Sequence, residues 1–147
     1  MSMYNHILVP MDLEHLDMFP KAIALAKQLL GDDRGKIHCV YVDTTRVHSS
    51  TFQLATERAK EMRLATKQRV HDEFEQQVPE HLRGSCHIRN GVVYDEILEE
   101  EKKVQPDVII IAAGKPGLSS YLLGSNAEKV LRHAKGSVFV IRDNKHW

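Results

Sequence analysis

The sequence predicts an α/β protein built on a doubly wound parallel sheet with helices on both faces. Three observations lead to this fold class. Short apolar runs rich in β-branched residues lie near both ends of the chain, at residues 6–10 and 107–113. Stretches with apolar residues at three- and four-residue steps separate the candidate strands. Strand and helix therefore alternate strictly, which is typical of parallel sheets with right-handed crossovers.

Five segments are predicted as strands. The runs at 6–10 and 107–113 are bounded by Pro, Asp or Gly, and their continuous apolar character fits strands that are buried on both faces. Three weaker candidates have similar composition. The five predicted strands cover residues 6–10, 36–42, 85–89, 107–113 and 137–141.

Four helices are predicted between these strands. The first covers residues 19–30, with Pro20 suited to its first turn and Gly31 to its end. The second covers residues 51–78 and is ended by Pro79. Its expected inward stripe consists of Ala55, Ala59, Met62, Thr66, Val70, Phe74 and Val78.

The third and fourth helices are shorter. In the third, at residues 94–104, we expect Ile97 and Leu98 to face inward and the glutamates at 99–101 to form a solvated face. The fourth covers residues 125–134, with Val130 and Leu131 inside and a glycine, Gly136, just beyond its end.

Composition limits the classes of protein that the chain can represent. A length of 147 residues suits one domain, spanning residues 1–147. Lys plus Arg and Asp plus Glu both number 20, which argues against a dedicated nucleic-acid binder. The longest apolar stretch, at residues 108–113, is far shorter than the roughly 20 residues that span a membrane. The N-terminus has no signal-peptide pattern, so we expect a cytoplasmic protein without membrane contact.

The loop after the most apolar strand carries the strongest functional signal. It contains Gly114, Lys115, Gly117 and Gly124, and a predicted helix begins near Ser125. In a doubly wound sheet, ligands bind beyond the carboxyl ends of the strands. Glycines let backbone N–H groups approach an anion, a helix N-terminus adds free donors, and a lysine adds a point charge. Together these features predict a phosphate site.

A structural explanation of the same residues stays open. The segment from Ser125 to Glu128 fits a capping box, in which the two side chains satisfy the first backbone N–H groups of a helix. Gly114 and Gly117 also suit ordinary turns, and the loop is neither a Walker A sequence nor a GxGxxG fingerprint. A cap uses only one or two donors, so capping and phosphate binding are compatible.

Other reactive residue types show no catalytic or metal-binding pattern. The nine histidines lack HxH or HxxxH spacing, so no metal site is predicted. No GxSxG nucleophile elbow is present, and no catalytic residue is assigned. Cys39 and Cys86 lie in predicted strands, where we expect buried, unreactive thiols.

Several segments taken together resemble one family. The matching segments are residues 7–12 (ILVPMD), Gly91 followed by 95–98 (DEIL), 106–111 (PDVIII), 122–127 (LLGSNA), 130–134 (VLRHA) and 137–142 (SVFVIR). This pattern resembles the universal stress proteins of bacterial type over nearly the whole chain. The resemblance implies a five-stranded parallel sheet of order 3-2-1-4-5. It also implies a homodimer that pairs the last strands, from Ser137 to Arg142.

The resemblance further implies a site for ATP or another adenine nucleotide, ADP or AMP, with or without Mg²⁺. ATP-binding members carry a Gly-x₂-Gly-x₉-Gly-(Ser/Thr) motif. Here only six residues separate Gly117 from Gly124, as in a short-loop subgroup related to the enterobacterial filament-associated stress proteins. Because the loop is shorter, we do not expect it to contact a triphosphate in the way that the longer motif does, and AMP or ADP would suit it as well as ATP.

Carried over by position, the implied site divides into five groups of residues. Pro10, Met11 and Asp12 face the adenosine, Val42 lies beside the adenine, Gly114, Lys115 and Gly117 wrap the phosphates or ribose, Gly124, Ser125 and Asn126 donate to phosphate, and Ser137 and Val138 close the site. For three of these residues a structural role is also open: a turn or helix cap for Asp12, the core for Val42 and a strand start for Ser137.

The function implied by the resemblance is that of a dimeric stress-response sensor or adaptor that binds an adenine nucleotide. A slow ATP hydrolase or self-phosphorylating protein is one alternative, and a nucleotide-free interaction module is another. A flavodoxin-like protein that binds FMN is a more distant alternative.

Overall fold

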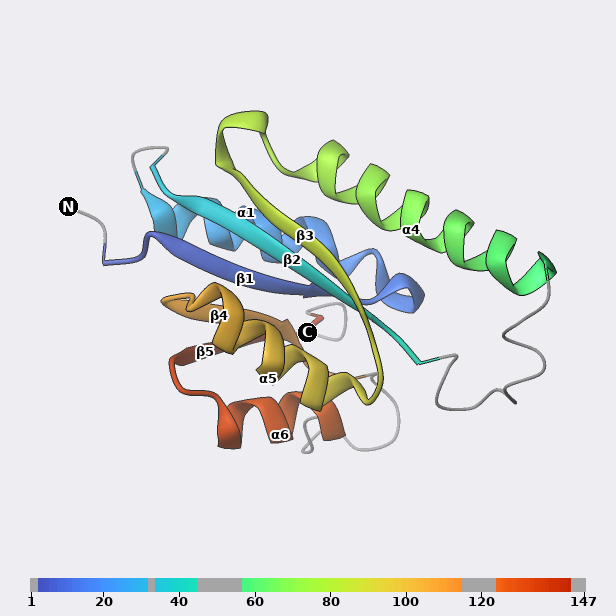
Figure 1. The fold of residues 1–147 in the computed structure, drawn as a ribbon. Helices are drawn as coiled ribbons and strands as arrows, with labels where there is room; N and C mark the ends of the chain where they lie inside the picture. Colours follow the sequence, from blue (N-terminus) through green and yellow to red (C-terminus); the bar gives the residue numbers. More distant parts are fainter. Residues whose placement is uncertain (1–2, 32–33, 45–56, 115–123, 144–147) are drawn as a thin grey trace.

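The computed structural model describes residues 3–31, 34–44, 57–114 and 124–143. Its centre is a five-stranded sheet of order β3-β2-β1-β4-β5 (Figure 1). Every neighbouring pair of strands is parallel, which confirms the predicted topology. The strands are β1 (His6–Met11), β2 (Lys36–Asp43), β3 (Arg83–Asn90), β4 (Val108–Ala112) and β5 (Ser137–Ile141).

Helices cover both faces of this sheet, as the alternation predicts. In the described ranges, the α-helices are α1 (Met18–Leu30), α4 (Glu57–Gln77), α5 (Val93–Val104) and α6 (Ser125–His133). Two single-turn 3₁₀ helices, η1 (Leu13–His15) and η2 (Glu80–Leu82), were not predicted. Gly31 ends α1 with φ of 72°, a conformation that side-chain-bearing residues rarely adopt. In the part of the chain that the structure describes, no helix is long and apolar enough to cross a membrane.

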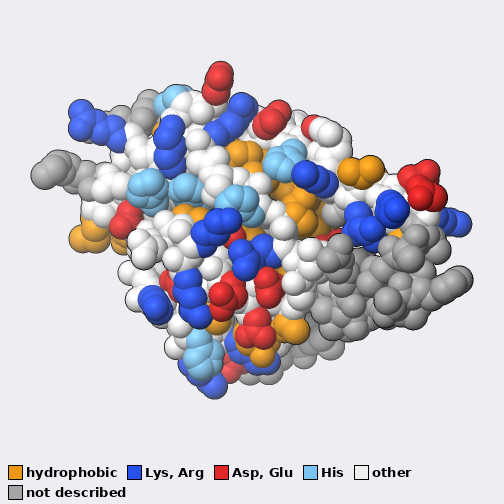
Figure 2. Space-filling model, viewed as in Figure 1, with side chains coloured by type: hydrophobic (Ala, Val, Ile, Leu, Met, Phe, Trp, Pro, Cys, Tyr) orange, Lys and Arg blue, Asp and Glu red, His pale blue; other side chains and the backbone are white. Residues whose placement is uncertain are grey.

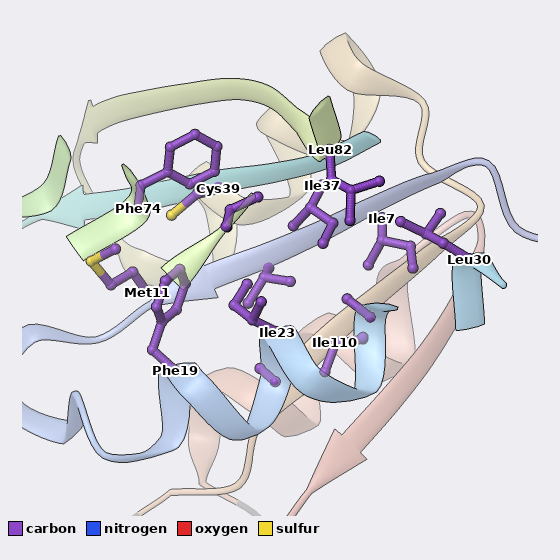
Figure 3. Packing of buried hydrophobic residues seen from close by; sticks show 14 of the residues in the cluster. Ile7, Met11, Phe19, Ile23, Leu30, Ile37, Cys39, Phe74, Leu82 and Ile110 are labelled. Atoms are coloured by element: carbon purple, nitrogen blue, oxygen red, sulfur yellow. The ribbon is translucent and has the colours of Figure 1, made fainter. Parts of the chain in front are cut away.

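The core has two halves because successive side chains of a strand point to opposite faces of the sheet. Ile7 and Met11 of β1 pack with α1 and the second half of α4 (Figure 3). Leu8 of the same strand packs with Val40, Val42 and residues of α5 and α6 on the other face.

Helix α4 departs from the expected inward stripe. Only Val70 and Phe74 within the helix are buried, whereas Met62 is 61% exposed. The first half of α4 leans away from the sheet (Figure 1), and no side chain in it is buried within the described residues. Leu131 of α6 is also wrongly predicted as buried, because its side chain is 47% exposed.

The glutamates of α5 are the largest correction to the predicted burial pattern. Glu99 is exposed, but Glu100 is 0% exposed and Glu101 is 4% exposed. Positions 97, 100 and 101 lie on one side of a helix, and that side faces the sheet. Each buried carboxylate has partners: Glu100 accepts from Arg89 and contacts His87, while Glu101 accepts the backbone N–H groups of residues 135 and 136.

Candidate functional site

The carboxyl ends of β1, β2 and β4 meet at one edge of the sheet. The chain crosses from one side of β1 to the other between β3 and β4, so the topological switch point lies between β1 and β4. Ligands of doubly wound proteins bind at such a switch point. Met11, Asp43 and Ala112 end these three strands, and α6 begins close to the end of β4.

Two glycines bring the end of β4 against the start of α6. A Cβ atom built on Gly114 would lie 2.7 Å from the Cα atom of Gly124, and a Cβ on Gly124 would lie equally close to Gly114. Real Cβ atoms essentially never come this close, so both positions require glycine for this packing. Lys115 and Gly117 lie between them, outside the described residues.

Within the described residues, the N-terminus of α6 has no side-chain cap. Its N-cap is Gly124, and Ser125 is the first residue within the helix. The expected capping box is therefore wrong: the Glu128 carboxylate accepts from Arg132 at 3.1 Å instead. An uncapped first turn leaves backbone N–H donors that can bind water or an anion. Gly124, Ser125 and Asn126 thus lie together at this edge, as the sequence predicts.

The end of β1 contributes mainly backbone to this edge. Met11 directs its side chain into the core beside Phe19 (Figure 3), so only its backbone can face a ligand. The Asp12 carboxylate accepts the Glu14 N–H at 2.9 Å and caps η1, the structural role left open for it. Pro10 is partly exposed and precedes them on the strand.

The end of β2 contributes an acid that sequence reasoning did not select. Val42 is buried in the core half beneath α5 and α6. Asp43 follows it, is also buried, and accepts the Gly91 N–H at 3.2 Å through its carbonyl. Burial raises the pKa of the nearby Tyr41, and the charges of Asp43 and Asp12 raise it further. An acidic residue that directly ends a buried strand was the available signal.

Ser137 and Val138 do not join this edge. They begin β5, and Ser137 pairs with Val108 at the opposite end of β4. The five residues of β4 place about 13 Å between its two ends. The structural role of Ser137, the start of a strand, is the one observed.

His6 and His38 lie on the neighbouring strands β1 and β2, and their rings stack. His38 accepts the Ser85 N–H at 3.0 Å through Nδ1, and its Nε2 lies 3.1 Å from Nδ1 of His6. Among the described residues, no group of three or more His, Cys, Asp or Glu is arranged to hold a metal ion.

Cys39 is buried as expected, but Cys86, opposite it on β3, is partly exposed. Burial raises the pKa of Cys39, and a hydrogen bond with the Cys39 thiol lowers that of Cys86.

The sheet order, with its switch point between β1 and β4, and the close approach of Gly114 to Gly124 define a class: a doubly wound parallel α/β protein. The family model for the universal stress proteins matches residues 3–142. The chain therefore belongs to the universal stress protein family.

Curated relatives and solved structures agree with this assignment. The chain is 32% identical to Universal stress protein G of Shigella flexneri over 143 residues, covering 95% of this chain and all of the relative. A universal stress protein of Methanothermobacter thermautotrophicus is 28% identical over 149 residues, with 96% and 97% covered.

Solved structures share the fold at lower identity. Universal stress protein UspA from Lactobacillus plantarum has a TM-score of 0.67 at 21% identity, covering 97% of this chain and 100% of that chain. A universal stress protein in complex with cAMP has a TM-score of 0.60 at 16% identity, with 96% and 98% covered.

Proposed function

We propose that the protein binds an adenine nucleotide at the carboxyl edge of the sheet and acts as a dimeric sensor or adaptor in a stress response. The observation that carries the proposal is the close contact of Gly114 with Gly124, which lies beside the uncapped N-terminus of α6. Free N–H donors and the positive end of the helix dipole suit a phosphate. A related universal stress protein has been crystallised with cAMP, which supports the choice of ligand class.

The two sides of the edge suit the two ends of a nucleotide. In the proposal, Gly124, Ser125 and Asn126 hold the phosphate, together with Lys115 and Gly117. Val42 and Pro10 contact the adenine, while Asp12 and the neighbouring Asp43 accept from ribose hydroxyls or hold Mg²⁺. This orientation is favoured electrostatically, because the acids lie on the β1–β2 side, away from the phosphate, and the N–H donors lie on the α6 side.

Thermal unfolding and calorimetric titration with ATP, ADP, AMP and cAMP test the proposal. A nucleotide at 100 times its Kd stabilises a protein by about 2.7 kcal/mol. We expect Asn126→Asp to weaken binding by about tenfold or more, because the new carboxylate repels phosphate. The same acid suits the first turn of a helix, so the variant stays folded.

Gln76→Glu is the matched control, because it adds the same charge at an exposed position on α4. It should leave the affinity unchanged. No heat and no thermal shift with any of the four nucleotides at millimolar concentration would refute the proposal.

We also propose that two copies pair through β5. This strand lies at one edge of the sheet, and Phe139 on it is 45% exposed. Leu131 of α6 adds a second exposed apolar side chain on a neighbouring element. An uncovered edge with apolar side chains favours pairing with a two-fold mate. Light scattering should give a dimer mass that Phe139→Lys converts to a monomer; a monomeric wild type at micromolar concentration would contradict this.

A further inference from the structure

An open groove runs between α4 and β3, at the sheet edge opposite β5. Its volume is about 780 Å³. The lining comes from residues 86–90 of β3, one side of α4, Lys103 of α5 and Asp43 at the end of β2. In the space-filling view, Lys and Arg side chains gather over this part of the molecule (Figure 2). The nucleotide site proposed above shares only Asp43 with this groove.

The groove is strongly basic. On α4, Lys60, Arg63, Lys67 and His71 recur at three- and four-residue steps and line it from one side of the helix. Among the described residues, five Lys and Arg side chains line the groove when Lys103 and Arg89 are included, and the only acid in the lining is Asp43. Arg89 is already paired with Glu96 and Glu100, so the excess positive charge comes from α4 and Lys103. This excess favours an acidic occupant, although the whole chain carries no net charge.

The wall of the groove is a sheet edge with backbone available for pairing. The Gly91 N–H donates to the Asp43 carbonyl of β2, and successive residues of a strand direct their backbone groups to opposite edges. The N–H and C=O groups of Cys86, Ile88 and Asn90 therefore point away from β2, toward the groove. Within the described ranges, no strand pairs with this edge of β3. Such an edge is a template for an added strand.

Helix α4 overhangs this edge without closing it. Its apolar residue Leu64 lines the groove and is 67% exposed, so the helix offers both charge and apolar surface to an occupant. An extended peptide beside β3 would turn alternate side chains toward α4. Acidic residues at every second position would then meet the cations of the helix.

We propose that the groove docks an extended acidic peptide segment of a partner protein, which adds to the sheet as a sixth strand beside β3. Its backbone pairs with Cys86, Ile88 and Asn90, and its acidic side chains pair with Lys60, Arg63 and Lys67. A peptide fits better than a nucleic acid strand, because no Phe, Tyr or Trp side chain among the described residues lines the groove for base stacking.

Fluorescence anisotropy with full-length protein tests the charge half of this proposal. The probe is a fluorescein-labelled peptide, Glu-Thr-Glu-Val-Glu-Thr-Glu. We expect the double variant Lys60→Glu/Lys67→Glu to weaken binding by about tenfold or more. The control Arg58→Glu/Arg69→Glu makes the same charge change on α4 at exposed positions outside the groove. It should change the affinity by less than about threefold.

Backbone pairing is tested on the probe, so that no protein variant has to fold. N-methylation at alternate positions blocks the N–H groups along one edge of the peptide. One of the two alternating series should lose about tenfold in affinity and the other should keep it. Equal affinity of both series would overturn strand addition.

Cys86 reports the location of binding. It lines the groove, whereas Cys39 is buried, so iodoacetamide should react first at Cys86. Saturating probe should slow this alkylation several-fold. Unchanged alkylation with bound probe would place the peptide elsewhere and overturn the proposal. Binding of an oligothymidylate of equal charge in place of the peptide would also overturn it.

Discussion

The buried carboxylate of Glu100 gives the most stringent test of how the α5 layer is held to the sheet. This side chain is 0% exposed, accepts from Arg89 Nη1 at 3.0 Å and contacts His87 Nδ1. Arg89 is held in turn by Glu96 at 2.9 Å. The substitution Glu100→Gln keeps the size of the side chain, so it removes charge and pairing without leaving a cavity.

The expected loss follows from the two contacts. A hydrogen bond to a charged group contributes about 1.5–3 kcal/mol, so two would contribute about 3–6 kcal/mol. The partners are partly exposed, 37% for His87 and 26% for Arg89, so water replaces part of what they lose. We therefore expect Glu100→Gln to lower the free energy of unfolding by about 2–3 kcal/mol.

Urea denaturation followed by far-ultraviolet circular dichroism measures this change. The control is Glu99→Gln, the same substitution one residue earlier. The Glu99 side chain is 51% exposed and pairs with the exposed Lys102, so the loss in Glu99→Gln should be below about 0.5 kcal/mol. If the two variants lose equal stability, or if Glu100→Gln matches the wild type, the buried network does not stabilise the fold as argued.

Three further predictions concern other parts of the molecule. The pKa of His38 is lowered from 6.5 to about 4, mainly by burial and also by the facing His6, His87 and Lys36, while Glu100 opposes the shift. Because the unfolded chain protonates His38 at a higher pH than the folded protein does, the contribution of neutral His38 to the free energy of unfolding should be complete above pH 6.5 and fall toward pH 4. Urea midpoints measured across this range should show the slope, and His38→Gln should flatten it. Gly114→Ala should separate α6 from β4 and cost about 1–3 kcal/mol, with weaker nucleotide binding in the titration above; unchanged stability would contradict the close contact. Glu101→Gln weakens the acceptor for two backbone N–H groups at the start of β5, so hydrogen exchange there should quicken while exchange in β1 stays slow.

The sequence determined the fold class through local pattern. Residues 108–111 are apolar and β-branched at every position, which is typical of a strand covered on both faces. Gly31 marked the end of α1 because a left-handed conformation there favours glycine. The edge segments after β1 and β4 were also found from sequence, because parallel strands bring their carboxyl ends together.

Tertiary structure decided which side chains those patterns serve. Helical spacing places Glu100 beside Ile97, but it does not reveal that Arg89 and His87 of β3 lie opposite Glu100 and contact it. The same limit applies to Ser137, which lies on the predicted strand but at its opposite end from the glycine pair. Period and propensity act over a few residues, whereas burial, pairing and the groove beside β3 depend on contacts between segments far apart in the chain.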